Sequence, residues 1–414
     1  MASVARVMIG LTGLAGLLAV SATRAQLLPV MPPVPIGGMV AGSIDRLTGD
    51  AAHLTGNVAD RLEQMRLYRL TALVRGAAGR IELDPDGAPA RAGELVLDQP
   101  DDAAIAAATA HGYRLIERGQ LIGVGYARLA APPGRSLKAA LRELRKLGGQ
   151  VSADQIHFQS GAASAPATIT PDGGGPIVGM IDGGVAGSAP SRGFATGAPR
   201  ASNHGSAVAS LIGGGGGIRG GLPGARVMVA DVYGSDPAGG NATAIAKALA
   251  WLVGERVGVV NISLVGPANP LLAQVVAAAR ARGTIIVAAV GNDGPAAPPG
   301  FPASYPGVIA VSGVDGRERP LIEAGRASHL DYVAPGADML ARDASGRAIR
   351  VRGTSFAAPL VAATFARFHP TSDPISAGRA TASVDAVARD LGKRGADPLY
   401  GRGLVCGDCR TMAK

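Results

Sequence analysis

Between residues 176 and 314, short apolar runs alternate with helical patterns, and this alternation constrains the fold more than any other feature of the chain. The apolar runs span residues 176–182, 226–233, 257–264, 284–291 and 307–314, and the helical patterns span residues 204–212, 241–254 and 269–282. Strands that are apolar on both faces and alternate with helices indicate a parallel sheet. We therefore expect an α/β domain over residues 176–405, a parallel sheet flanked by helices on both faces.

Residues 93–160 follow a different order. The patterns predict strands at 94–98, 113–119, 122–129 and 152–159 and helices at 101–112 and 135–148. This β-α-β-β-α-β order predicts a small α+β, ferredoxin-like domain. Residues 161–175 break all periodicity and predict a linker before the α/β domain.

The first 92 residues divide into two parts. In residues 1–25, Arg6 precedes the apolar run Val7–Ala22, and small residues follow, which predicts a signal peptide. A membrane anchor is the alternative, because the run is near the lower length limit for a spanning helix. We favour cleavage, which would leave a secreted or periplasmic protein with no stable membrane anchor. Residues 26–92 combine a Pro/Gly-rich linker with a helical pattern at 43–75 and a hairpin pattern at 81–97, and we assign them no role.

Composition excludes some classes of protein. Of 414 residues, 47% are hydrophobic and 17% charged, so a disordered chain is excluded. The net charge of +9 is dispersed and aromatic residues are only 3%, so we expect no nucleic-acid partner. In the tail at residues 406–414, Cys406 and Cys409 could close a small disulfide loop if the protein is exported. A redox or metal CxxC site would need further ligands or a thioredoxin-like unit, and neither is visible.

Polar residues occur where the predicted strands end and where two helices begin. Asp182, Ser263 and Asn292 follow apolar runs, and His204 and Ser355 open helical patterns. Because functional groups in parallel sheets lie beyond the carboxyl ends of the strands, we expect all five to converge on one edge. An acid, an imidazole, a hydroxyl and an amide at one edge are the groups that acyl transfer requires.

Each residue type has a specific task in that chemistry. The hydroxyl of Ser355 would be the nucleophile, and His204 would accept its proton and later return it. The carboxylate of Asp182 would fix the imidazole tautomer and stabilise the imidazolium. The Asn292 side chain and the Ser355 backbone N–H would stabilise the oxyanion of the tetrahedral intermediate.

These residues lie in segments that resemble a known family. IVGMIDGG, NHGSAVAS, AAVGNDG and RGTSFAAP are similar to the four signature segments of the subtilisin-like serine proteases, in the family's order, over about residues 170–405. The resemblance implies a serine endopeptidase that hydrolyses polypeptides through an acyl-enzyme on Ser355, with Asp182 and His204 as its partners and Asn292 as an oxyanion donor. It also implies two walls that bind substrate as an added strand, one of Ser263, Leu264 and Val265 and the other of Gly239 and Gly240.

The chain departs from the family pattern at three places. Gly183 replaces the hydroxyl residue that usually follows the acid, so Asp182 would have one hydrogen bond fewer. Val265 replaces a glycine at the rim of the specificity pocket, which predicts a preference for small or unbranched side chains before the cleaved bond. The loop Gly213–Gly221 lacks the oxygen ligands of the family's calcium loop, so we expect no metal and no cofactor. Its glycines match a dinucleotide motif but follow a helix, so they do not predict nucleotide binding.

Two questions stay open at this level. The ferredoxin-like domain resembles the propeptides of secreted subtilases, which act as intramolecular chaperones and inhibitors. Residues 154–161 would then occupy the cleft before autoprocessing between about 155 and 175; a permanent accessory domain is the alternative.

The interpretation of the five residues as an active site also has an alternative, a pseudoprotease that uses the same cleft to bind peptides. An esterase of the α/β-hydrolase type is rejected, because Ser355 lies in GTSFA and comes last in the chain order.

Overall fold

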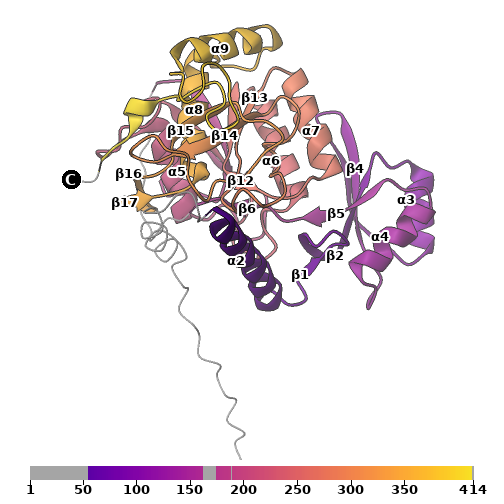
Figure 1. Ribbon diagram of the computed structural model, residues 1–414. Helices are drawn as coiled ribbons and strands as arrows, with labels where there is room; N and C mark the ends of the chain where they lie inside the picture. Colours follow the sequence, from indigo (N-terminus) through magenta and orange to yellow (C-terminus); the bar gives the residue numbers. More distant parts are fainter. Residues whose placement is uncertain (1–54, 162–173, 188, 413–414) are drawn as a thin grey trace, which may run out of the picture. The chain divides into compact units, whose positions relative to one another are not determined.

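The computed structural model describes residues 55–161, 174–187 and 189–412, and its largest sheet is the one that the apolar runs predict (Figure 1). Seven parallel strands lie in the order β15-β14-β13-β11-β8-β10-β9. They are β8 (Ile177–Asp182), β9 (Ser191–Gly193), β10 (Arg226–Asp231), β11 (Val259–Ile262), β13 (Ile285–Ala289), β14 (Ile309–Val314) and β15 (Tyr332–Pro335). Five lie within the predicted runs, whereas β9 and β15 were not predicted.

Helices cover both faces of this sheet, which confirms the α/β fold class. One face carries α5 (Asn203–Gly213) and α8 (Thr354–Phe368), and the other carries α6 (Ala242–Gly254) and α7 (Pro270–Ala281). A side chain one residue before α5, α6 and α7 caps each of them by accepting from a backbone N–H of the first turn: Ser202, Asn241 and Asn269. A further helix, α9 (Pro374–Val387), packs on α8.

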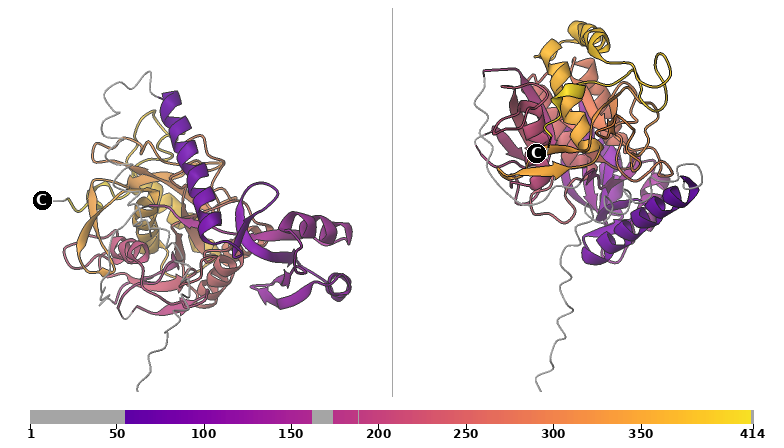
Figure 2. Two further views of the ribbon diagram at one scale, coloured as in Figure 1. Left: turned by 90° about the horizontal axis from the view of Figure 1, so that it is seen from below. Right: turned by 60° about the vertical axis from the view of Figure 1, so that its left-hand side comes forward.

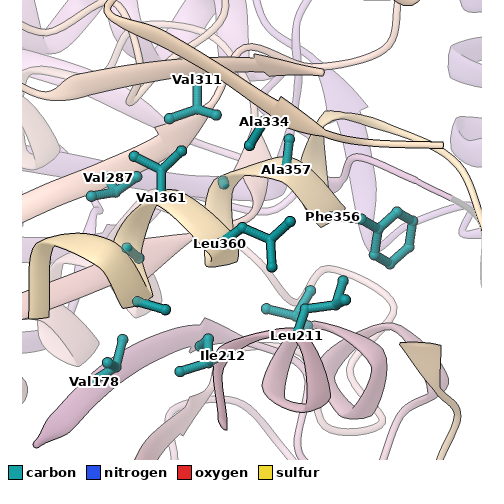
Figure 3. Close-up of a cluster of buried hydrophobic side chains, with 14 of the residues drawn as sticks. Val178, Leu211, Ile212, Val287, Val311, Ala334, Phe356, Ala357, Leu360 and Val361 are labelled. Atoms are coloured by element: carbon teal, nitrogen blue, oxygen red, sulfur yellow. The ribbon is translucent and has the colours of Figure 1, made fainter. Parts of the chain in front are cut away.

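The core on the α5/α8 side explains why α8 is held rigidly. Twelve of its fifteen residues are buried. Figure 3 shows Val361 pointing toward Val287 and Val311 of the sheet, while Leu360 points toward Leu211 of α5. Because small residues alternate with these larger ones in α8, the helix packs closely against both layers. Its first turn is therefore fixed at the edge of the sheet.

The second sheet belongs to the ferredoxin-like unit. It comprises β1 (Ile81–Leu83), β2 (Pro89–Asp98), β3 (Arg114–Leu121), β4 (Val124–Ala130) and β5 (Val151–Gln155), with helices α3 (Asp102–Ala110) and α4 (Leu137–Lys146). The order is β1-β2-β4-β3, with β5 also paired to β2, and all pairs are antiparallel. Elements β2 to β5 follow the predicted β-α-β-β-α-β order. The expected boundary at residue 93 lies inside β2, so the hairpin at 81–97 is part of this sheet.

Alternate residues of β2 face two different layers. Leu95 and Leu97 pack with α4, whereas Val96 joins the cluster that contains α6 and α7. This period-two pattern is that of a strand buried on both sides. The ferredoxin-like sheet therefore has α3 and α4 on one face and the helices of the α/β domain on the other (Figure 1).

Several further elements complete the described chain. Helix α2 (Thr55–Gly76) overlaps the helical pattern at 43–75, ends one residue beyond it and is a single straight helix outside the ferredoxin-like sheet (Figure 2). Strands β16 (Met339–Arg342) and β17 (Ala348–Val351) form a hairpin, and a disulfide joins Cys406 to Cys409 around η1 (Gly407–Cys409). The predicted signal peptide and most of the 161–175 linker lie outside the described residues. Across the described ranges, no helix combines the length and apolar character needed to cross a membrane.

Candidate active site

Asp182 and His204 are hydrogen-bonded at the carboxyl edge of the larger sheet. Asp182 is the last residue of β8 and is fully buried, and His204 is the second residue of α5. The His204 Nδ1 lies 2.9 Å from each carboxylate oxygen of Asp182. Because a carboxylate only accepts, Nδ1 carries the proton, and the lone pair of a neutral ring then lies on Nε2. The pair has the arrangement of an oriented general base.

Ser355 is the second residue of α8 and lies at the same edge. Its hydroxyl donates to the carbonyl of Ser263 at 3.1 Å, and its Oγ lies 2.6 Å from the Oγ of Ser160. The buried Nε2 of His204 has no hydrogen-bond partner among the described residues. The expected hydrogen bond between Ser355 and His204 is therefore not formed in this conformation, because Ser263 and Ser160 hold the hydroxyl.

Asn292 follows β13 and lies beside the start of α8. Its Oδ1 accepts from the backbone N–H of Thr354 at 3.0 Å, while its Nδ2 is buried without a partner in the described chain. A Cβ placed on Gly353, whose φ is +140°, would lie 2.8 Å from that Nδ2 and 3.1 Å from the carbonyl oxygen of Ser160. The missing side chain at Gly353 thus leaves room for a carbonyl next to an unpaired amide donor.

A segment of the chain itself lies between the two predicted walls. Strand β6 (Phe158–Gln159) pairs antiparallel with β12 (Leu264–Val265), in the register Gln159–Leu264 and Phe158–Val265. On the other side, the N–H of His157 donates to Gly240 at 2.8 Å. Gly239 does not bond this segment; it packs on the backbone of Tyr233. The chain is therefore bound in the cleft as an added strand.

The carbonyl of Ser160, the residue after β6, lies at the first turn of α8. The backbone N–H of Ser355 donates to it at 3.1 Å, and the N–H of Ser160 donates to Ser263 at 3.3 Å. The next residue, Gly161, has a φ of +150°, and a Cβ there would lie 2.6 Å from the Phe356 ring. Sequence reasoning identified residues 154–161 as the cleft segment but did not identify Ser160 as the residue facing Ser355.

Val265 lies where the sequence predicted a narrowed pocket. A Cβ at Gly291 would lie 3.0 Å from a methyl group of Val265, and a Cβ at Gly300 would lie 2.4 Å from the same side chain. The isopropyl group therefore fills space between these two glycines.

The strand β5 ties the ferredoxin-like unit to the starts of α6 and α7. Asp154 is fully buried and accepts from the N–H of Thr243 in the first turn of α6, at 2.9 Å. The Asn269 side chain at the start of α7 donates to Gln155 at 2.7 Å. Burial raises the pKa of Asp154, and nearby Arg128 opposes that shift. These contacts set the path of the chain into the cleft, and sequence reasoning missed them because both helices are distant in sequence.

Helix α2 lies against the loop that follows Asn292. Arg69 forms an ion pair with Asp293, and a Cβ at Gly294 would lie 2.9 Å from Leu62. Near its other end, Leu73 and Val74 pack with the cluster that includes Phe158. The helix thus contacts both the cleft segment and the loop carrying the amide. No sequence signal pointed to this position.

The Gly213–Gly221 loop is occupied by a guanidinium group. Arg342 donates to the carbonyl of Gly215 at 3.1 Å and also to that of Gly216. Its third contact is with the carbonyl of Gly346, at 2.7 Å. Within the residues that the structure describes, no group of three or more His, Cys, Asp or Glu side chains could hold a metal ion.

A parallel sheet with an Asp–His pair at its carboxyl edge and a serine at a helix start defines the subtilisin-like class. The profile of the Subtilase family matches residues 177–403, and the chain belongs to this family. Subtilisin DY of Bacillus licheniformis is 32% identical over 170 residues, which cover 40% of this chain and 61% of that protein. Subtilisin BL of Lederbergia lenta is 31% identical over 196 residues, or 47% of this chain and 71% of that protein.

A solved structure has the same fold. The crystal structure of fervidolysin from Fervidobacterium pennivorans, a keratinolytic enzyme related to subtilisin, superposes with a TM-score of 0.63 at 19% identity. The superposition covers 80% of this chain and 63% of fervidolysin. It therefore extends beyond the 227 residues between 177 and 403 that the family profile matches.

Proposed function

We propose that this chain is an exported serine endopeptidase that first cleaves its own Ser160–Gly161 bond. One observation carries the proposal: the Ser160 carbonyl accepts from the N–H of Ser355 while its chain is paired with β12. A carbonyl so placed is polarised by the donor that would stabilise its oxyanion. Ser160 would then be the residue before the cleaved bond, and Gly161 the new amino terminus.

The reaction needs one rotation of the Ser355 side chain, away from Ser263 and toward Nε2 of His204. Oγ of Ser355 then attacks the carbonyl carbon of Ser160 while Nε2 takes its proton. The tetrahedral oxyanion is held by the Ser355 N–H and by Nδ2 of Asn292. When the C–N bond breaks, His204 returns the proton to the nitrogen of Gly161, leaving an ester on Ser355. Water attacks this ester, His204 takes its proton, and Ser355 is restored.

The same cleft would then accept other polypeptides along the path of residues 156–160. The space taken by Val265 favours substrates with a small or unbranched residue before the cleaved bond. This chemistry involves no metal or cofactor. The ferredoxin-like unit and α2 are proposed to act as a propeptide, a folding aid and inhibitor, because β5 and β6 lead directly into the cleft. Export rests on the predicted signal peptide at residues 1–25.

Purified full-length chain tests the proposal. Mass spectrometry should find a fragment beginning at Gly161, and a fluorophosphonate probe should label Ser355. Ser355→Ala should remove both results, and Ser191→Ala, at an exposed serine of β9, serves as a matched control that still processes. An intact chain without labelling would instead favour the peptide-binding pseudoprotease.

A further inference from the structure

The glutamine that precedes Ser160 contacts the acid of the candidate active site. The side-chain amide of Gln159 donates to Oδ1 of Asp182 at 2.9 Å. The same oxygen accepts from the N–H of Gly183 at 2.7 Å and from His204. The buried carboxylate therefore receives one of its hydrogen bonds from the segment in the cleft rather than from the α/β domain.

The α/β domain has no side chain of its own at this position. Residue 183 is glycine, and a Cβ on it would lie 2.9 Å from the Cβ of Ser202 and 3.1 Å from the Gln159 amide nitrogen. The nearby hydroxyl of Ser202 donates to Gly184 at 3.3 Å and accepts from Gly205 at 3.0 Å. Its proton is thus directed away from Asp182. When the strand leaves, the carboxylate loses the Gln159 donor and Ser202 does not replace it.

The position of Gln159 is fixed by its backbone. It pairs with Leu264, and the next residue places its carbonyl against the N–H of Ser355. Any polypeptide that binds in this register places the second residue before its cleaved bond at the position of Gln159, beside Asp182. A side chain of glutamine length with an N–H donor can then repeat the contact.

We propose that the site selects polypeptides with glutamine two residues before the new amino terminus, and that this glutamine acts as a positioning residue for Asp182. The inference rests on the proposed function. The amide hydrogen bond stabilises the charged carboxylate and fixes its orientation toward Nδ1 of His204, so it strengthens the base when the imidazolium forms. The effect therefore appears in the rate of the chemical step more than in substrate binding.

Peptides of the sequence Ile-His-Phe-Xaa-Ser-Gly, given to the processed protein obtained from the full chain, test this inference. We expect kcat for Xaa = Gln to exceed kcat for the nearly isosteric Met by about tenfold or more, with KM within about threefold, since hydrogen bonds to charged groups are the stronger ones. The full chain offers a second test, because Gln159→Met should slow its own cleavage by a similar factor.

A compensating variant tests whether the glutamine acts by positioning Asp182 or only because its side chain fits the cleft. Gly183→Ser combined with Ser202→Gly introduces a hydroxyl beside Asp182 and removes the clashing side chain; a glycine cap costs little relative to serine. The Gln-over-Met ratio in kcat should fall toward one in this double variant and stay high in Ser202→Gly alone. Equal kcat for the Gln and Met peptides in the parent protein would overturn the inference while leaving the endopeptidase intact. Failure to cleave any peptide, with no labelling of Ser355, would overturn the proposed function and the inference with it.

Discussion

The N–H of Ser355 donates to the carbonyl of Ser160 at 3.1 Å, although the two residues are 195 positions apart. This contact joins the first turn of α8 to the last residue of the cleft strand. It places one peptide bond, Ser160–Gly161, beside Ser355. A segment of the chain itself therefore lies in the cleft where the proposed reaction would occur.

Gly161→Ala should slow cleavage of the full chain by about tenfold or more. Gly161 has a φ of +150°, and its Cβ would lie 2.6 Å from the Phe356 ring, so alanine must move the bond away from Ser355. The amount of fragment formed over time, measured by mass spectrometry, checks this. Gly174→Ala is the matched control, because nothing lies within 4 Å of its Cβ. Equal rates for Gly161→Ala and the parent chain would contradict the proposed bond.

Leu62→Ala should weaken the binding of the cleaved N-terminal fragment to the cleft. Leu62 is 7% exposed and packs on Gly294, so its truncation removes contact between α2 and the loop after Asn292. We expect the fragment's inhibition constant to rise on the order of tenfold, from a loss of about 1–3 kcal/mol at this partly enclosed position. Tyr68→Ala, at a side chain 74% exposed on the same helix, should have no effect. An unchanged constant in Leu62→Ala would show that α2 does not contribute to inhibition.

Acidification should release the fragment. His157 is fully buried in the cleft strand, and burial lowers its pKa to about 4, although the carbonyls of Gln155 and Pro267 oppose this shift. The bound strand thus takes up a proton less readily than the free strand, whose histidine has a pKa of about 6.5. Binding is fully retained above pH 6.5 and weakens as the pH falls toward 4, by about 25-fold between pH 7 and pH 5.

Co-elution of the cleaved fragment with the processed protein at a series of pH values measures this directly. His157→Phe should abolish the pH dependence, because phenylalanine cannot be protonated. Tyr233, which donates to the carbonyl of His157 at 2.7 Å, stays neutral over this range because burial raises its pKa. If the His157→Phe fragment lost as much binding between pH 7 and pH 5 as the parent fragment, a group other than His157 would be responsible for the pH dependence.

A chelator should leave the thermal unfolding of the protein unchanged. The guanidinium of Arg342 donates to two carbonyls of the Gly213–Gly221 loop, those of Gly215 and Gly216. Arg342→Ala should lower the unfolding temperature by about 2–4 °C. The exposed Arg350 on the same hairpin provides the control Arg350→Ala. A chelator that lowers the unfolding temperature of the parent chain would contradict this prediction.

Periodicity was enough to predict most of the α/β fold. The strands that carry Asp182 and Asn292 are continuous apolar runs, and the helix after His204 is preceded by the capping residue Ser202. Strands β9 and β15 were missed because three and four residues are too short to show a period. The edge on which the candidate residues converge followed from the parallel order alone.

The contacts that decide the chemistry could not be predicted in the same way. The scissile bond depends on the register between β6 and β12, which only two pairs of residues define. The orientation of the Ser355 hydroxyl toward the carbonyl of Ser263 depends on which group fills the cleft. The amide of Gln159 reaches Asp182 only because Gly183 leaves space, and no local pattern links residues 23 positions apart.

The pairing of residues 156–160 with both walls has a consequence for the timing of activity. Under the proposed function, a freshly folded molecule has no unoccupied cleft for another polypeptide until two events have occurred in order: cleavage of the Ser160–Gly161 bond and departure of the fragment. The first is independent of concentration, since it is intramolecular. The second, departure of the fragment, is favoured by dilution. On that proposal, molecules at high concentration would stay latent, and dilution would make them active.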